Sequence, residues 1–219
     1  MAKSGTTTPR ERYRQQVRAE VKERAWEQIA TAGASALSLN AIAKQMGMSG
    51  PALYRYFASR DELITELIRD AYSSLAGAFR DTAKSSKSGA DLTALAHALR
   101  AWALEHPQRY FLVYGTPVPG YHAPDDVTAL ASDIMTTLLD ACAALPGTGS
   151  SVPPLDEHLE GHREWAGDHD ASPAALHRAL SFWTRLHGVL SLELAGHFTG
   201  MGFDPALLFA AELDGLTAN

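Results

Sequence analysis

Residues 37–64 read LSLNAIAKQMGMSGPALYRYFASRDELI, and this stretch decides the fold. Its apolar pattern predicts a short helix over 39–46, which Ser38 caps and Gly47 ends. A glycine between two helices allows the left-handed turn that sets them steeply across each other. Another helix follows this turn at once, so the stretch predicts a helix-turn-helix over 38–57.

Helical patterns continue on both sides of this motif. Apolar residues recur at helical spacing over 17–33, and Ser59 with Glu62 predicts a capping box that opens a long helix. Further helices are expected over 91–106, from 107, over 125–145, over 172–198 and over 205–216, with a long polar loop over 146–170. Because no strand pattern competes, the predicted fold class is all-α, with about nine helices in a small N-terminal domain and a larger C-terminal domain.

The charge of the chain is divided unevenly. Residues 1–60 carry ten Lys and Arg against four Glu, a net charge of +6, although the whole chain carries −6. The rest of the chain therefore carries −12. A basic end on an acidic body indicates that the N-terminal part meets a polyanion such as DNA.

Several classes of protein are not expected from this sequence. The lone Cys142 allows neither a disulfide within the chain nor a CxxC metal or redox site, which fits a reducing cytoplasm. The N-terminus lacks the apolar segment of a signal peptide, and no uncharged apolar run of about 18 residues predicts a membrane span. The chain also lacks G-x-S-x-G, P-loop and G-x-G-x-x-G motifs. We therefore expect a cytoplasmic protein that is not an enzyme and needs no cofactor.

His158 and His162 are the strongest candidates for metal binding. They lie four residues apart in an acidic segment, but they read His-Leu-Glu-Gly-His rather than the His-Glu-x-x-His of zinc proteases. A solvated acidic loop is the favoured interpretation and a metal site is the alternative, so no metal is expected.

The stretch 37–64 resembles the TetR family of bacterial regulators. The family pattern has an apolar helix, Gly-x-Ser in the turn, two small residues before Leu-Tyr-x-His/Tyr-Phe, and then Ser/Asn-Lys/Arg-x-Glu-Leu. Tyr56 departs from the pattern, since His is common at that position. Gly50-Pro51 is a second departure, because it leaves the start of the recognition helix with few side-chain donors.

The resemblance implies that the motif binds double-stranded operator DNA. Phosphate contacts are expected from Ser38, Ser49, Tyr54, Tyr56 and Arg60, and the residues nearest the bases are Gly50, Pro51, Ala52 and Arg55. A basic arm over 1–14 is expected to be flexible and to reach the minor groove. The DNA-binding domain is then expected over 15–75, and an effector-binding and dimerisation domain over 76–219.

Residues 100–121 and the motif Trp183-x-x-x-His187-Gly188 resemble a ligand-domain subgroup of the family that is named for Trp-His-Gly. This resemblance implies a helical effector domain whose last two long helices pair with those of a second copy. The hydropathy pattern agrees, because the helix over 172–198 is apolar around most of its circumference and must be covered on more than one side. We therefore expect a homodimer.

A mostly apolar effector pocket with a few polar groups is expected inside the second domain. Its predicted lining is Trp102, His106, Tyr110, Phe111, Tyr114, Met135, Phe182, Trp183, Leu186 and His187, with His106, Arg109, Tyr121 or His187 as the polar groups. The alternative is that these are ordinary core and dimer residues. In that case, close helix packing at Gly188 beside a buried, hydrogen-bonded His187 explains the motif without a ligand.

Together these patterns predict a homodimeric transcriptional repressor that binds a palindromic operator and is released by a small apolar effector. One alternative is an activator or an architectural DNA-binding protein without a ligand. Another is a helical metal-binding protein or enzyme that carries a helix-turn-helix domain.

Overall fold

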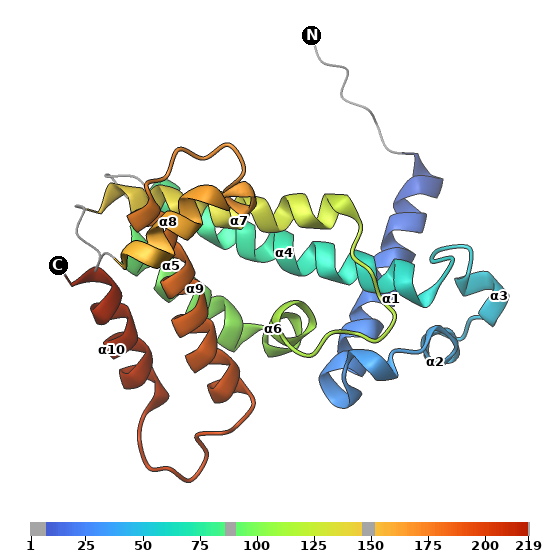
Figure 1. The fold of residues 1–219 in the computed structure, drawn as a ribbon. Helices are drawn as coiled ribbons and strands as arrows, with labels where there is room; N and C mark the ends of the chain where they lie inside the picture. The colour runs from blue at the N-terminus through green and yellow to red at the C-terminus, as the bar shows by residue number, and fades with distance from the viewer. Residues whose placement is uncertain (1–7, 86–90, 146–151, 219) are drawn as a thin grey trace. The chain divides into compact units, whose positions relative to one another are not determined.

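The computed structural model describes residues 8–85, 91–145 and 152–218 (Figure 1). In these ranges the regular structure consists of ten α-helices and two short 3-10 helices, with no strand. The all-α fold class is therefore confirmed. The chain divides into two compact units, of which the first runs to Ile68 and includes Thr116–Ala123, and the second comprises the remainder.

The first unit contains the predicted helix-turn-helix (Figure 1). Its elements are α1 (Pro9–Ala32), the 3-10 helix η1 (Ala34–Ala36), α2 (Leu39–Gln45), α3 (Gly50–Leu53) and the first turns of α4 (Arg60–Ser85). Gly47 has a φ of +65° in the turn between α2 and α3, as expected from its place in the sequence. The core beneath the motif is apolar and fully buried, with Val21, Ala25, Ile42, Leu53, Phe57, Leu63, Ile64 and Leu67.

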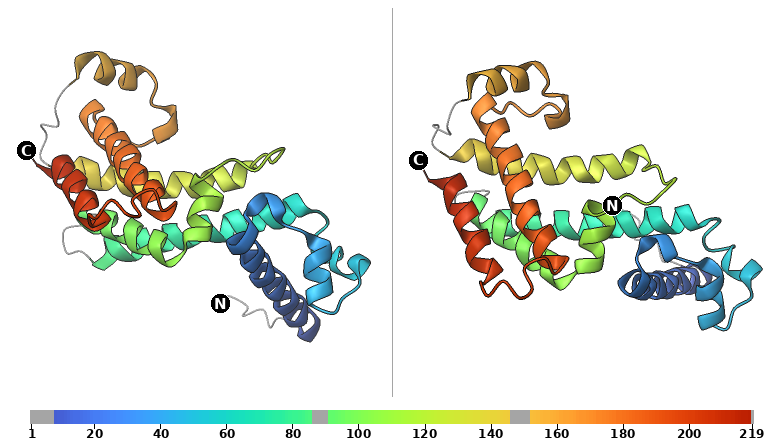
Figure 2. Two further views of the ribbon diagram at one scale, coloured as in Figure 1. Left: turned by 90° about the horizontal axis from the view of Figure 1, so that it is seen from below. Right: turned by 60° about the horizontal axis from the view of Figure 1, so that its bottom comes forward.

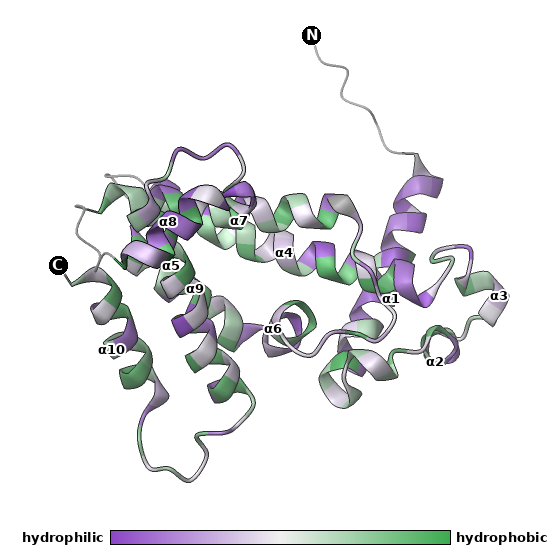
Figure 3. Ribbon diagram, in the orientation of Figure 1, coloured by the Kyte–Doolittle hydropathy of each residue, from purple (hydrophilic) through white to green (hydrophobic). Residues whose placement is uncertain are grey.

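α1 begins earlier than expected. The hydroxyl of Thr8 accepts from the Glu11 amide at 3.3 Å, and the Glu11 carboxylate accepts from the Thr8 amide at 2.7 Å. This capping box, followed by Pro9 in the first turn, starts the helix inside the predicted arm. The prediction of a flexible arm over 1–14 is therefore wrong for residues 9–14, which are helical. Residues 1–7 lie outside the described part of the chain. The first turns of α1 are strongly hydrophilic (Figure 3).

α3 is shorter than expected, because the predicted helix to residue 57 ends at Leu53. The amide of Tyr54 still bonds to the carbonyl of Gly50, four residues back, at 3.1 Å. The amides of Arg55 and Tyr56 bond only three residues back, at 3.3 and 2.8 Å, so the chain tightens into turns over 54–56.

The second unit is built around α9 (Pro173–Leu194), which packs against α10 (Pro205–Thr217), α7 (Asp125–Ala144) and α8 (Pro153–Gly161). α9 and α10 lie side by side in both views of Figure 2, drawn in orange and red. The remaining elements are α5 (Leu92–Glu105), α6 (Pro107–Tyr114), the 3-10 helix η2 (Glu164–Ala166) and the later turns of α4.

Two boundaries in the second unit differ from the prediction. The expected loop over 146–170 contains the nine-residue α8, because Pro153 and Pro154 fit a first helical turn and Leu159 is buried; residues 146–151 lie outside the described ranges. α9 ends at Leu194 rather than at residue 198, since Gly196 adopts a φ of +77° and the next amide returns to the Leu192 carbonyl.

α7 contains the stretch Asp126–Ala144, whose length and hydropathy alone would suffice for a membrane span. A membrane span was not predicted here, because isolated polar residues interrupt the apolar run. In the structure, 33% of this stretch is buried, and α7 packs against α5 and α9. Its exposed face carries polar side chains such as Asp133, Thr136 and Asp140. Core helices of globular domains pass the same test, and α7 has the polar outer face that such helices have.

Candidate functional site

The segment Ser49–Tyr56 is held to the first unit by two fully buried side chains, Leu53 and Phe57. Tyr54 and Arg55 are exposed between these anchors, and Ser49 and Pro51 are exposed before Leu53, whereas Gly50, Ala52 and Tyr56 are half-buried. Phe57 belongs to the core, as the sequence analysis expected. The segment therefore presents hydroxyls, one guanidinium and small apolar groups on a rigid support.

The two predicted N-cap serines behave differently. Ser38 is confirmed as the N-cap of α2, since its hydroxyl accepts from the Ala41 amide at 3.3 Å. Its own amide donates to the side chain of Gln28 at 3.0 Å, which ties α2 to α1. Ser49 precedes α3 but its hydroxyl makes no capping bond, and the residue is exposed.

Gly50 allows α2 and α3 to approach each other closely. A Cβ atom at this position would lie 3.3 Å from the side-chain oxygen of Asn40 on α2. Asn40 is itself exposed, so it adds a polar group to the same surface. Asn40 was not predicted as a site residue, although its place in the first turn of α2, two residues after the capping serine, was a usable signal.

Arg60 has partners different from those predicted. Its guanidinium donates to the carbonyls of Ala34 at 2.8 Å, Leu37 at 3.2 Å and Ser35 at 3.3 Å. These carbonyls belong to η1 and the residue that follows it, directly before α2. Arg60 therefore fixes the entry into the helix-turn-helix from inside the unit.

The capping box at the start of α4 forms with one shift. Ser59 Oγ accepts from the Glu62 amide at 3.0 Å, as predicted. The Glu62 carboxylate accepts from the amide of Ala58 at 2.6 Å, rather than from the amide of Ser59. The connection between α3 and α4 is thus closed by hydrogen bonds on both sides.

Arg18 on α1 is a residue that sequence reasoning missed. Its guanidinium donates to the Tyr56 carbonyl, pairs with Glu62 at 3.6 Å and Glu66 at 3.3 Å, and lies 4.1 Å from the centre of the Phe57 ring. It therefore joins α1 to both the end of the α3 segment and α4. In the sequence, Arg18 could not be distinguished from the other basic residues among the ten in 1–60, because none of its partners is near it in the chain.

In the second unit, four predicted ligand residues form one aromatic cluster: Tyr110 and Tyr114 on α6, and Trp183 and His187 on α9. Ring centres lie 4.5 Å apart for Tyr114 and His187, 4.3 Å for Trp183 and His187, and 5.5 Å for Tyr114 and Trp183. The Tyr110 ring stacks on His187 at 5.5 Å and meets Phe111 edge-on at 5.7 Å. Each helix contributes a pair at i, i+4 spacing, which places both members of the pair on one face of that helix.

The other predicted ligand residues lie elsewhere. Trp102 is buried, donates to the Ser74 hydroxyl at 3.1 Å and meets the His106 ring edge-on. Phe182 and Leu186 are fully buried core residues of α9. Tyr121 belongs to the first unit, where its hydroxyl contacts that of Thr65 at 3.1 Å.

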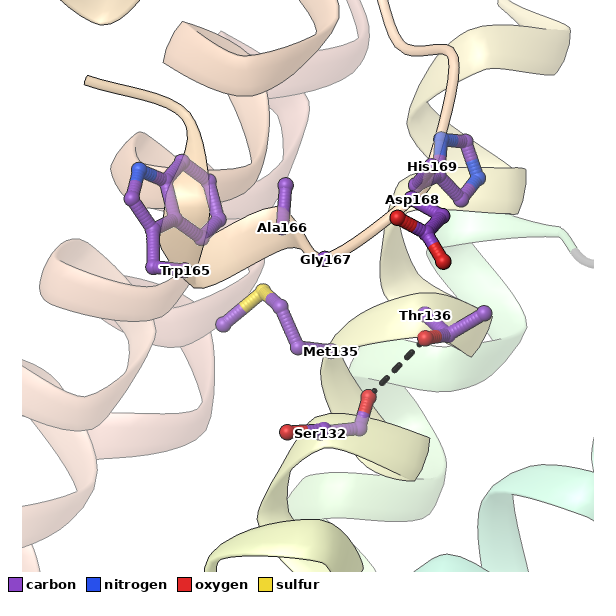
Figure 4. Close-up of a pocket in the computed structure, with 8 residues that line it drawn as sticks. All are labelled: Ser132, Met135, Thr136, Trp165, Ala166, Gly167, Asp168 and His169. Atoms are coloured by element: carbon purple, nitrogen blue, oxygen red, sulfur yellow. Dashed lines mark hydrogen bonds between the residues drawn. The ribbon is translucent and has the colours of Figure 1, made fainter.

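Met135 lines a cleft of about 320 Å³ between α7 and the segment that contains η2 (Figure 4). Its lining is Ser132, Met135, Thr136, Trp165, Ala166, Gly167, Asp168 and His169. No other predicted ligand residue lines this cleft. The single pocket expected from the sequence thus corresponds to separate places in the unit.

Burial controls the ionisation of the aromatic cluster. Loss of contact with water lowers the pKa of His187 to about 4 and raises the pKa values of Tyr110 and Tyr114 above their ordinary range. All three side chains are therefore uncharged at neutral pH. Burial also raises the pKa of the Cys142 thiol to about 12, which suits a core residue rather than a nucleophile.

The histidine pair of α8 does not assemble a recognisable metal site. The rings of His158 and His162 stack with centres 4.1 Å apart, and His162 Nδ1 lies 2.9 Å from the His158 carbonyl. Within the described ranges, no group of three or more His, Cys, Asp or Glu side chains is placed to hold a metal ion.

Comparison with known protein families matches both parts of the chain. The family model for bacterial regulatory proteins of the tetR family matches residues 23–67, and that for the tetracyclin repressor-like C-terminal domain matches residues 92–216. The chain belongs to the TetR family. The resemblance found in the sequence is thereby confirmed, and the protein is a helix-turn-helix transcriptional regulator.

Similar proteins support this assignment over nearly the whole chain. The HTH-type transcriptional regulator Rv1816 of Mycobacterium tuberculosis is 37% identical, over 91% of this chain and 90% of its own length. A solved structure described as regulatory protein SCO4313 is 69% identical, with a TM-score of 0.87 over 97% of this chain and all of that one. A protein of unknown function from Rhodococcus sp. RHA1 shares the fold at 23% identity, with a TM-score of 0.66 over 91% of this chain and 93% of its own.

Proposed function

We propose that this TetR-family regulator is a homodimeric repressor that binds a palindromic operator and leaves it when a small, mostly apolar effector binds the second unit. The observation that carries this proposal is the exposed Ser49–Tyr56 segment on a fully buried support. The repressor acts in the cytoplasm, where its DNA lies.

The DNA contacts come from the exposed face of this segment. Hydroxyls of Ser49, Tyr54 and Tyr56 reach phosphates, and Arg55 with the small residues at the start of α3 lies nearest the bases. The hydroxyl of Ser38 is already used as a cap, so this residue acts through the geometry of α2. Arg60 likewise acts as a positioning residue, because its guanidinium is held by backbone carbonyls.

Dimerisation is supported by an uncovered stripe on α9 and α10. The alternative interpretation of the motif had close helix packing at Gly188, but among the described residues nothing lies within 4 Å of the place of a Cβ there. Leu192, one turn later, is 43% exposed, and Leu207 on α10 is 70% exposed. Small residues beside exposed leucines allow a second helix pair to approach closely, so a second copy is the natural cover.

Arg185 joins α9 to α10 near this stripe. Arg185, one turn before Gly188, reaches Glu212 on α10 at 3.9 Å. The same guanidinium lies 3.9 Å from the place of a Cβ on Gly215, which follows Leu207 by two turns. Two copies joined here would read two half-sites about 34–36 Å apart.

Two segments connect effector binding to the DNA-binding unit. α4 is one continuous helix whose residues to Ile68 belong to the first unit and whose later residues belong to the second. The chain also leaves α6 directly after Tyr114 and enters Thr116–Ala123, where Tyr121 contacts Thr65 of α4. An effector that changes the balance of conformations must bind one of them more tightly, and these segments would carry the difference.

DNase I footprinting of the region upstream of the protein's own gene tests the proposal. The expected result is a protected palindrome that overlaps the promoter, with sedimentation showing one dimer in solution. Gly188→Trp should convert the dimer to monomer and abolish the footprint, whereas Gly161→Ala at the end of α8 should leave both unchanged. A footprint that survives as a monomer, or no protected site in a search of genomic fragments, would contradict the proposal.

A further inference from the structure

Two polar atoms of the aromatic cluster lack hydrogen-bond partners. The hydroxyl of Tyr114 and Nε2 of His187 are completely enclosed, and neither bonds to any residue in the described part of the chain. Their rings are neighbours, with centres 4.5 Å apart. A buried polar atom without a partner destabilises the folded state, so two in one cluster indicate a missing partner.

The hydrogen bonds of Tyr110 define the state of His187. The Tyr110 hydroxyl donates to the His187 backbone carbonyl at 3.1 Å and lies 3.0 Å from Nδ1. Because the hydroxyl has one proton and gives it to the carbonyl, Nδ1 must carry a proton and donate to the Tyr110 oxygen. In a neutral imidazole this leaves Nε2 as a bare acceptor.

The two unpartnered atoms therefore need different hydrogen-bond partners. Tyr114 offers a hydroxyl that keeps its proton, because burial raises its pKa, and His187 offers an acceptor. A hydroxyl or a carboxamide satisfies both, since each of these groups donates and accepts. A carboxylate only accepts, and it would face the lone pair of Nε2. An ammonium would lose its water in a cluster whose burial already disfavours the charged form of His187.

The aromatic cluster is not fully buried. Tyr114, Trp183 and His187 are half-buried as whole residues, although the two polar atoms are enclosed. An apolar ligand that packs against the outer side of these rings would bring its polar end to the enclosed atoms if the side chains move slightly apart.

We propose that Tyr114 and His187 together bind the single polar group of an uncharged, otherwise apolar effector, and that this group is a hydroxyl or a carboxamide. The proposal rests on the proposed function only in that the second unit holds the effector. It deepens that function by excluding anionic and cationic molecules.

Four probes that share one ring and differ in the polar group test the selectivity. Benzyl alcohol, benzamide, benzoate and benzylammonium are titrated into the full-length protein without DNA, and binding is followed by saturation-transfer NMR. The two neutral probes should bind about tenfold more tightly than the charged ones, a difference of about 1.4 kcal/mol. Because no DNA is present, failure here is distinguishable from failure of the footprint.

Two variants separate the hydrogen bonds from simple stacking. Tyr114→Phe keeps the ring and removes the donor, and His187→Asn keeps a donor near Tyr110 and removes Nε2. Each should abolish the preference for neutral probes, whereas Tyr13→Phe, exposed on α1, should retain it. Binding of a charged probe as tight as that of the neutral ones, a preference that survives in Tyr114→Phe, or no binding of any probe overturns the proposal.

The Tm of Tyr114→Phe without any probe gives an independent result. If the hydroxyl has no partner in the free protein, removing it should raise Tm by about 2–4 °C. A lower Tm would mean that the hydroxyl already has a partner, such as a buried water, and would overturn the proposal.

Discussion

The helix-turn-helix and the aromatic cluster differ in whether their polar groups have hydrogen-bond partners. Around the helix-turn-helix, Arg18 and Arg60 donate to backbone carbonyls, and Ser38 and Ser59 accept from amides. In the aromatic cluster, the Tyr114 hydroxyl and His187 Nε2 remain without partners among the described residues. The first arrangement fixes a surface in one shape before it meets DNA. The second leaves hydrogen-bonding capacity for a molecule that is not part of the chain.

Of the substitutions considered, Arg18→Ala is expected to destabilise the first unit most strongly. It removes the bond to the Tyr56 carbonyl, two ion pairs and the contact with the Phe57 ring. Loss of a partly buried network of this kind should lower the free energy of unfolding by about 3–4 kcal/mol, measured by urea denaturation. Arg24→Ala is the matched control, because Arg24 pairs with the exposed Glu27 and its loss should cost under about 1 kcal/mol. Equal effects in the two variants would show that Arg18 does not organise the unit.

Acid should destabilise the aromatic cluster through His187. Its pKa is about 4 in the folded protein, below the ordinary histidine value of 6.5 that applies to the unfolded chain, so the unfolded chain takes up the proton first as pH falls. Stability is therefore full above about pH 6.5 and is lost toward pH 4, by up to about 3 kcal/mol. His187→Asn cannot titrate, and the difference in unfolding free energy between it and the wild type should shrink over this range. A constant difference from pH 7 to pH 4 would rule out a neutral, buried His187.

Arg60→Ala distinguishes a positioning residue from a phosphate contact. Three carbonyls of the segment before α2 would lose their donor, which should lower stability by about 2 kcal/mol. Arg60→Lys should recover only part of this, since a lysine cannot reproduce the planar fork. If Arg60→Ala instead keeps the wild-type Tm and weakens only DNA binding, Arg60 is a direct phosphate contact.

Local signals in the sequence predicted the helix-turn-helix well. Ser38 as a cap and Gly47 as a left-handed turn depend on residues within four positions, and both are present as expected. The start of α1 was missed because basic residues suggested an arm, although Thr8, Pro9 and Glu11 form a capping box that the sequence displays.

Contacts between residues far apart in the chain could not be predicted from the sequence. Arg60 bonds to Ala34, 26 positions away, and Arg18 bonds to Tyr56, 38 positions away. Met135 was predicted to line the effector pocket, but the sequence could not show which neighbours it faces, and it lies in the α7 cleft instead of the aromatic cluster. In contrast, the i, i+4 pairs of α6 and α9 were recognisable, because this spacing places both members of a pair on one face of the helix.

The most direct test of the account compares two exposed arginines on the footprinted operator. Fluorescence anisotropy at one fixed salt concentration would measure the affinity of Arg55→Ala, in the exposed α3 segment, and of Arg80→Ala, on the exposed face of α4 in the second unit. Loss of a direct DNA contact should weaken Arg55→Ala at least about tenfold, with an unchanged Tm, while Arg80→Ala binds like the wild type. Equal affinities for the two variants would contradict the claim that the Ser49–Tyr56 segment is the surface that contacts DNA.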